Sequence, residues 1–224
     1  MVATLLGHWA AVNDLCWAHG NEYIVSASTD CSVIVWDVGA RELFHVCLGH
    51  TKPVLAVGLD ASLKYIVSAG EDCSIIIWSW EIAVRDPSEG SSAALIRTLQ
   101  QPPPGKKKSR RPVAIADDPT TAEAQQELEP EPELGHTGPV RSIVVDRTAR
   151  YFISASDDGS VCIWNFRGKR LAQLNETHID DVFCVRVNAN RKMLASAARD
   201  KTLAIYQLGA TTREMHTTNC MFVM

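Results

Sequence analysis

Residues 7–37 read GHWAAVNDLCWAHGNEYIVSASTDCSVIVWD, and the order of a few residue types in this stretch returns three more times. Gly-His opens it at Gly7-His8 and recurs at Gly49-His50 and Gly135-His136, with Thr177-His178 as a degenerate fourth copy. From His8 to His50 is 42 residues, and from His136 to His178 is again 42. Because a repeat period of about 20–50 residues is the signature of repeat architectures, the fold has to be derived from this unit.

Three further residue types recur at fixed distances after each histidine. A serine follows it by 18 residues, an aspartate by 22 and an aromatic residue by 28. The four sets are His8, Ser26, Asp30 and Trp36; His50, Ser68, Asp72 and Trp78; His136, Ser154, Asp158 and Trp164; and His178, Ser196, Asp200 and Tyr206. Four markers in register in four copies are not a product of chance.

Short runs rich in β-branched residues lie between these markers, for example residues 23–27 and 32–36, and turn residues such as Gly20-Asn21 separate them. Such runs at regular spacing predict antiparallel strands, and no sustained helical periodicity is present. We therefore expect an all-β fold made of four antiparallel four-stranded sheets.

The units Gly7–Asp37, Gly49–Ser79, Gly135–Asn165 and Thr177–Gln207 resemble WD40 repeats, the blades of a β-propeller. The resemblance implies a hydrogen-bonded tetrad in each unit, from Trp N–H to Ser, from Ser to His and from His to Asp. Thr177 and Tyr206 depart from the pattern, so the fourth blade is expected to be the most irregular, with the Tyr206 hydroxyl replacing the indole donor.

Ser, His and Asp are also the ingredients of a hydrolase triad. A catalytic site occurs once in a chain, whereas this set recurs four times with an aromatic residue attached. The sequence therefore predicts structural tetrads and no enzyme.

Four blades are fewer than the seven or eight that the resemblance implies for a propeller. We expect an incomplete or unusually small propeller, with one strand at Ala3–Leu6 and an outer strand within Arg213–Val223. A second copy, a different chain or missing blades of a longer propeller would complete the ring, and a closed four-bladed ring is the alternative.

The distance from His50 to His136 is 86 residues, which is one period of 42 plus 44 more. Residues 1–99 are expected to hold repeats 1 and 2, and residues 134–224 repeats 3 and 4. Residues 100–133 are rich in proline and charge, a composition that predicts a disordered insertion. Ala94–Leu99 is expected to be the outer strand of the second blade, preceded by a shorter insertion at Glu81–Ser92.

The basic run Lys106–Arg111 within the insertion has three interpretations. It is a solvated loop segment neutralised by nearby acids, a nuclear-import signal or a docking patch for an acidic partner. Cytoplasmic location is expected, with nuclear import through this run as the alternative.

Composition excludes several classes of function. With 22 basic and 26 acidic residues, the net charge of −4 gives no footprint for nucleic acid or an anionic membrane. No apolar stretch is long enough to span a bilayer. The seven cysteines form no CxxC pair and lie at no zinc-ligand spacing, so we expect no metal and no cofactor.

The expected function is that of a protein-interaction scaffold or adaptor subunit that binds proteins or peptides on the histidine-side face. Resemblance to G-protein β subunits places contacts three and five residues after each histidine and one before each aspartate. The candidates are Asn13, Leu55, Glu71, Arg141, Asp157, Asp181, Phe183 and Arg199. A half-propeller completed by self-association or another chain, and a nuclear RNA- or chromatin-associated platform, are the alternatives.

Overall fold

The computed structural model describes residues 4–18, 20–85, 94–100, 135–146, 150–174, 177–188, 190, 192–208 and 219–223. These residues form four antiparallel sheets of four strands, which we call blades 1 to 4. Blade 1 holds β1 (Val12–Trp17), β2 (Tyr23–Ser28), β3 (Ser32–Asp37) and β4 (Glu42–Leu48); blade 2 holds β5 (Val54–Leu59), β6 (Tyr65–Gly70), β7 (Ile75–Ser79) and β8 (Leu95–Leu99). Blade 3 holds β9 (Val140–Val145), β10 (Phe152–Ser156), β11 (Val161–Trp164) and β12 (Arg170–Leu174); blade 4 holds β13 (Val182–Val187), β14 (Met193–Ala198), β15 (Leu203–Gln207) and β16 (Asn219–Val223).

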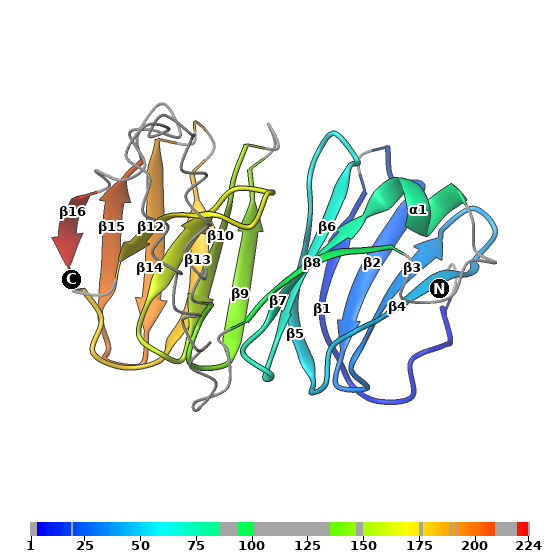
Figure 1. The fold of residues 1–224 in the computed structure, drawn as a ribbon, viewed down its shortest axis with the longest axis horizontal. Helices are drawn as coiled ribbons and strands as arrows, with labels where there is room; N and C mark the ends of the chain where they lie inside the picture. The colour runs from blue at the N-terminus through cyan, green and yellow to red at the C-terminus, as the bar shows by residue number, and fades with distance from the viewer. Residues whose placement is uncertain are drawn as a thin grey trace, which may run out of the picture.

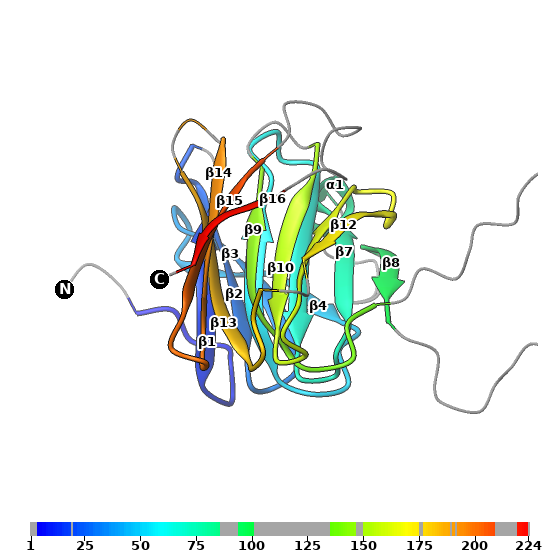
Figure 2. The same cartoon turned by 90° about the vertical axis from the view of Figure 1, so that its left-hand side faces the viewer.

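The blades stand side by side in chain order, with blade 1 and blade 4 at opposite ends of the molecule (Figure 1). The first strand of each blade packs against the first strand of the next, from β1 to β5, β9 and β13. Figure 2 shows β1 and β13 toward one side of the molecule and β8 and β12 toward the other. The described part of the chain is thus an open arc of an incomplete propeller, as the sequence predicts.

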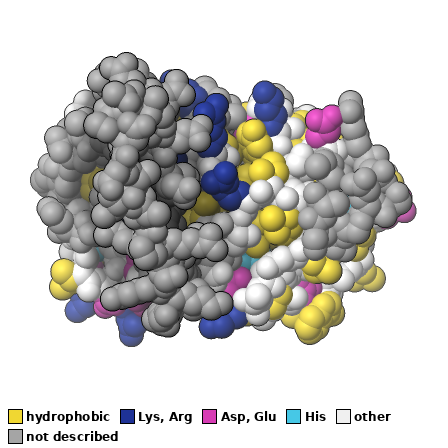
Figure 3. Space-filling view, viewed as in Figure 1, with side chains coloured by type: hydrophobic (Ala, Val, Ile, Leu, Met, Phe, Trp, Pro, Cys, Tyr) yellow, Lys and Arg dark blue, Asp and Glu magenta, His cyan; other side chains and the backbone are white. Residues whose placement is uncertain are grey.

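The core lies between neighbouring blades. Val25 and Val33 of blade 1 pack with Val57 and Ile66 of blade 2 in one buried cluster, and equivalent clusters join blades 2 and 3 and blades 3 and 4. The two inner blades bury both faces, which explains an unbroken apolar run such as Ile75–Trp78 in a strand that would otherwise alternate. Figure 3 shows exposed hydrophobic side chains on the right, where blades 1 and 2 lie.

The residue after each tetrad aspartate has a positive φ. The values are 69° at Cys31, 61° at Cys73, 78° at Gly159 and 68° at Lys201. This left-handed residue lets the chain reverse between the second and third strands of every blade. Blades 1 and 2 therefore place a cysteine where glycine is the residue of lowest strain.

The structure corrects two expectations. Residues 80–85 form a short helix, α1 (Trp80–Arg85), where the sequence suggested only an insertion; Trp80 and Ala83 are buried against the core between blades 1 and 2, which stabilises the turn. Residues 4–6 form no strand, because no edge strand of blade 4 lies beside them to supply hydrogen bonds.

Of the other expectations, some agree with the structure and some concern residues that the structure does not describe. The outer strands at Leu95–Leu99 and Asn219–Val223 form as predicted. Of the predicted insertion at residues 100–133, all but Gln100 lies outside the described residues, including Lys106–Arg111, as does most of Glu81–Ser92. Within the described residues, no helix is long and apolar enough to cross a membrane.

Candidate functional site

A repeated backbone hydrogen bond positions the loop that enters each blade. The N–H of the residue before the tetrad aspartate donates to the carbonyl three residues after the histidine, at N–O distances of 2.9, 2.9, 2.9 and 2.8 Å in blades 1 to 4. The bond from Thr29 to Ala11 is the first of this series. This bond brings the predicted contact positions that follow the histidine, and the one that precedes the aspartate, to the same end of the blade.

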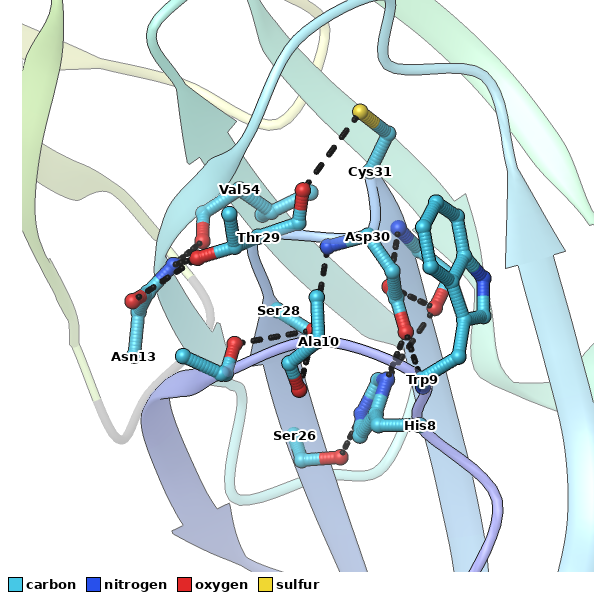
Figure 4. A network of polar contacts seen from close by, with 12 residues as sticks. His8, Trp9, Ala10, Asn13, Ser26, Ser28, Thr29, Asp30, Cys31 and Val54 are labelled. Carbon is cyan, nitrogen blue, oxygen red and sulfur yellow. Dashed lines mark hydrogen bonds and ion pairs between the residues drawn. The ribbon is translucent and has the colours of Figure 1, made fainter.

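The tetrad hydrogen bonds hold this loop against the sheet. In blade 1, Trp36 Nε1 donates to Ser26 Oγ at 2.7 Å, Ser26 Oγ lies 2.7 Å from His8 Nε2, and His8 Nδ1 lies 2.8 Å from Asp30 Oδ2. Figure 4 shows His8 between Ser26 and Asp30. Because a carboxylate only accepts, Nδ1 carries a proton, and in the neutral ring the serine hydroxyl donates to Nε2. The same three contacts are present in blades 2 and 3.

Blade 4 keeps only part of this network. Ser196 Oγ lies 2.6 Å from His178 Nε2, and His178 Nδ1 lies 3.2 Å from Asp200 Oδ2. Tyr206 is buried at the tryptophan position, but its hydroxyl makes no hydrogen bond to Ser196, so the predicted replacement of the indole donor is wrong. The phenol carries its oxygen at the far end of the ring, whereas indole carries its N–H at the side.

Sequence reasoning missed a fifth member of each network. The residue two after the aspartate donates its hydroxyl to that carboxylate at 2.5–2.6 Å in all four blades. These residues are Ser32, Ser74, Ser160 and Thr202. Their hydroxyl at a constant spacing was the signal that could have revealed them.

These bonds shift the pKa of the aspartates. Burial alone raises the pKa of Asp200, but hydrogen bonds from Thr202, Ile179 N–H and His178 lower it to about 2. The pKa values of Asp30, Asp72 and Asp158 are also lowered, by their histidines, hydroxyls and backbone N–H groups against the effect of burial.

The histidine of blade 3 shows the reverse effect. Burial lowers the pKa of His136, while its bond to Asp158 and the nearby Cys162 sulfur raise it to about 9. When the ring carries both protons, Ser154 accepts a hydrogen bond from Nε2 as well as from the indole.

The tetrad serines are badly placed for nucleophilic chemistry. Their exposed fractions are 4, 0, 0 and 1% for Ser26, Ser68, Ser154 and Ser196. In blades 1 to 3 an indole N–H also occupies a lone pair of the hydroxyl oxygen. A substrate carbonyl has no path to these atoms, so this geometry favours a structural role. Among the described residues, no group of three or more His, Cys, Asp and Glu side chains could hold a metal ion.

A β-bulge in every innermost strand presents one predicted contact residue. In blade 1, Val12 and Asp14 pair with consecutive residues of β2, which leaves Asn13 as the extra residue. The equivalent extra residues are Leu55, Arg141 and Phe183. Since a bulge re-aims a side chain, all four point into the same space. They line a groove of about 400 Å³ bounded by β1, β5, β9 and β13.

Charged side chains surround this groove on the side of blades 3 and 4. Arg141 binds Asp157 through two hydrogen bonds, Nε to Oδ1 at 2.5 Å and Nη2 to Oδ2 at 2.7 Å, and its Cζ lies 5.9 Å from the centre of the Phe183 ring. The bond to Asp157 raises the pKa of Arg141. Arg199 lies 3.3 Å from Asp181, on the same face.

The remaining predicted residues differ in their contacts. Glu71 is exposed, and its N–H donates to Pro53 O at the 2.9 Å of the repeated backbone bond. Asn13 Nδ2 donates to Thr29 Oγ1 and, across the blade boundary, to Val54 O at 2.7 Å, as Figure 4 shows. Arg186 of β13 also lines the groove and was missed, because it belongs to none of the positions that the resemblance marked.

The repeats of this structure match a known family profile. The profile described as "WD domain, G-beta repeat" matches residues 1–37, 41–79, 128–165 and 168–207. The chain belongs to the WD40 family. Proteins of this WD40 family are generally protein-interaction scaffolds.

Individual relatives match the WD40 chain over different lengths. A guanine nucleotide-binding protein β subunit from maize (Zea mays) is 26% identical over 219 residues, covering 92% of this chain and 57% of that protein. A mouse (Mus musculus) component of chromatin assembly factor 1 is 38% identical over 60 residues, covering 27% of this chain and 10% of that protein. A chicken (Gallus gallus) Denticleless protein homolog is 51% identical over 43 residues, or 19% of this chain and 6% of that protein. The chain thus spans 57% or less of the length of each of these relatives.

Proposed function

We propose that this WD40 chain is a non-enzymatic scaffold that binds a protein or peptide segment across its histidine-side groove. The observation that carries the proposal is the set of four bulged residues, Asn13, Leu55, Arg141 and Phe183, which meet in one groove. A strand bulge that recurs at the same position in four blades places side chains for contact and adds nothing to the ladder of strand pairing.

Phe183 and Arg141 form the centre of the proposed contact. Phe183 is 46% exposed, and the Arg141 guanidinium over its ring is fixed by Asp157. An exposed aromatic ring beside a pre-organised arginine is the combination that dominates binding energy at protein interfaces. Leu55 on the neighbouring blade supplies an apolar wall, so the groove suits a segment with an apolar side chain flanked by polar groups.

Capture experiments test the proposal. The immobilised chain is compared with a Phe183→Ala, Leu55→Ala, Arg141→Ala triple variant, with bound proteins identified by mass spectrometry. The control is Lys64→Ala, Lys192→Ala, whose residues are exposed in turns at the other end of the blades. Proteins lost from the triple variant but kept by the control support the proposal. Unchanged capture by a triple variant with the parent circular dichroism spectrum overturns it.

A chromatin-associated platform is the second candidate, favoured by the match to the chromatin assembly factor 1 component. The basic run Lys106–Arg111 would then serve nuclear import. Nuclear accumulation of the fluorescently tagged chain, lost on replacing Lys107, Lys108 and Arg110 by alanine, is the expected result. Equal distribution of parent and variant between nucleus and cytoplasm contradicts it.

A further inference from the structure

Each blade places two side chains at its histidine-side end beside the groove. One belongs to the bulged residue five after the histidine, and the other to the residue before the tetrad aspartate, 16 residues further on. The repeated backbone hydrogen bond of the entering loop holds both residues at this end. We call these two residues the rim pair of a blade. The rim pairs are Asn13 and Thr29, Leu55 and Glu71, Arg141 and Asp157, and Phe183 and Arg199.

Hydrogen bonds join the rim pairs of blades 1 and 3. Asn13 Nδ2 donates to Thr29 Oγ1 at 3.1 Å (Figure 4). Arg141 donates to both carboxylate oxygens of Asp157. A ligand that takes a polar group of these rim pairs has to replace a hydrogen bond that already exists, which lowers the gain from binding.

The charged residue of the rim in blade 4 is also paired, although with a different residue. Phe183 has no hydrogen-bonding group in its side chain, and Arg199 Nη1 instead donates to Asp181 Oδ2 at 3.3 Å. The carboxylates of Asp157 and Asp181 thus each face an arginine of their own blade.

Blade 2 is the exception, because its rim pair combines an apolar residue with an acid. Leu55 has no polar group to offer Glu71, which is exposed. The main chain of Glu71 is engaged, since its N–H donates to Pro53 O at 2.9 Å and its carbonyl accepts from Cys73 Sγ. Among the described residues, no lysine or arginine forms an ion pair with the Glu71 carboxylate, not even Lys52 of the same loop.

The charges around Arg141 leave one acid in excess. The pKa of Arg141 is raised by hydrogen bonds to Asp157, against the effect of burial. The charges of Asp157, Asp181 and Glu71 raise it further, so all three acids lie near this guanidinium. The first two are in ion pairs with arginines, and the uncompensated negative charge is that of Glu71. This part of the rim therefore favours a cation.

Neighbouring blades on both sides hold Leu55 and Glu71 in place. Strand β5 packs against β1 on one side and β9 on the other. Leu55 is half-buried, and Glu71 directly follows β6, the strand that pairs with β5, so an apolar surface leads to an exposed carboxylate. This combination suits lysine and arginine, whose aliphatic stems cover apolar surface while the charged head stays in water.

Arg186 is the groove residue that would favour the opposite choice, an acidic ligand. It lies near the far end of β13, three residues beyond Phe183, and therefore away from the rim. Its Nη1 donates to Val185 O at 2.7 Å and lies 3.4 Å from Ser142 Oγ of blade 3. Neutral acceptors thus hold this guanidinium on the wall of the groove, and the rim beside blade 2 keeps its negative excess.

We propose that the segment bound in the groove carries a lysine or arginine side chain that pairs with Glu71 and packs its stem on Leu55. The occupant is a basic peptide segment of a partner protein, selected by charge complementarity at the rim. A neighbouring apolar side chain of the segment packs on the exposed Phe183 ring. This inference rests on the proposed function, because it names the chemistry of the segment that the groove binds.

Selection of random peptides displayed on phage tests the charge preference. Peptides selected on the immobilised parent chain are expected to be enriched in lysine and arginine and depleted of aspartate and glutamate. The Glu71→Lys variant is expected to reverse this preference. Glu22→Lys is the matched control with the same change of charge. Glu22 is exposed in the turn between β1 and β2, at the other end of the blade, and this variant keeps the parent preference.

A double-mutant cycle assigns the contact to Glu71. With a selected peptide that carries one basic residue, Glu71→Gln is expected to weaken binding about twofold to fivefold in fluorescence polarisation, the range of an exposed ion pair. Replacing the basic residue of the peptide by glutamine weakens binding to the parent chain by a similar factor and adds nothing to the loss in Glu71→Gln. Equal losses with and without the Glu71 carboxylate overturn the assignment.

The triple variant Phe183→Ala, Leu55→Ala, Arg141→Ala separates failure of this inference from failure of the proposed function. Peptides that bind the parent but not the triple variant, without a preference for basic residues, leave the scaffold proposal standing and overturn the basic segment. Enrichment of acidic residues also overturns it and makes Arg186 the ligand contact. Peptides that bind both chains equally, or no enrichment at all, overturn both proposals.

Discussion

Replacing one tetrad serine by alanine in blade 2 and in blade 4 separates the contribution of the indole hydrogen bond from that of the histidine. In Ser68→Ala, both Trp78 Nε1 and His50 Nε2 lose a partner at 2.8 Å, inside a blade where Ser68 and Trp78 are 0% exposed. In Ser196→Ala, only His178 Nε2 loses one. A stranded buried polar group costs about 1–3 kcal/mol, which gives about 4 kcal/mol for the first variant and about 2 kcal/mol for the second.

Thermal unfolding followed by circular dichroism measures the difference. For a chain of this size, each kcal/mol lowers Tm by about 2–4 °C, so drops of about 12 °C for Ser68→Ala and about 6 °C for Ser196→Ala are expected. Both substitutions remove the same hydroxyl from a buried strand, so each serves as the control for the other. Equal drops in the two variants would show that the indole bond contributes nothing to stability and would refute the reasoning.

Three further predictions concern acid stability, backbone strain and thiol reactivity. Because the folded pKa of Asp200 is about 2, below an unfolded value of about 3.9, its contribution to stability is complete above about pH 4 and is lost as the pH falls through about 2. Asp200→Asn should therefore flatten urea-unfolding stability between these pH values, and an unchanged slope contradicts this assignment. Gly159→Ala, at a φ of 78°, should destabilise by about 1 kcal/mol or more in the same urea assay, whereas no loss would mean that the turn adapts. Burial raises the pKa of Cys47 to about 12, so maleimide at pH 8 should modify half-exposed Cys31 first and Cys47 only after unfolding; early labelling of Cys47 contradicts its burial.

The strand units could be predicted because their markers report local geometry. The 18-, 22- and 28-residue spacings from His8 to Ser26, Asp30 and Trp36 are set by the lengths of the first three strands and of the two turns between them, and these lie within a single blade. The order of hydrogen bonds within the tetrad came from the resemblance to WD40 repeats. The failure at Tyr206 came from ring geometry, since a phenol hydroxyl and an indole N–H can both donate but project in different directions.

The sequence predicted only some of the features of the candidate groove. Spacing marked Asn13, Leu55, Arg141 and Phe183 as equivalent, but the bulge that turns them inward depends on strand pairing. Arg186 went unnoticed because its access to the groove arises from the arrangement of β13 beside β9. The division at residues 100–133, and the disorder inferred there from composition, stay predictions.

What the sequence determined by itself is the repeating unit: its length, its strands, its turns and the residues that tie them together. These features depend on contacts within about 42 residues, and such contacts leave a period in the chain. Only the tertiary structure decided which faces of the blades are covered. Val12 and Val54 occupy the same position in the same pattern, and one is 51% exposed while the other is 0% exposed. Burial at a blade boundary belongs to the neighbouring blade, and no residue within a repeat records whether that neighbour is present.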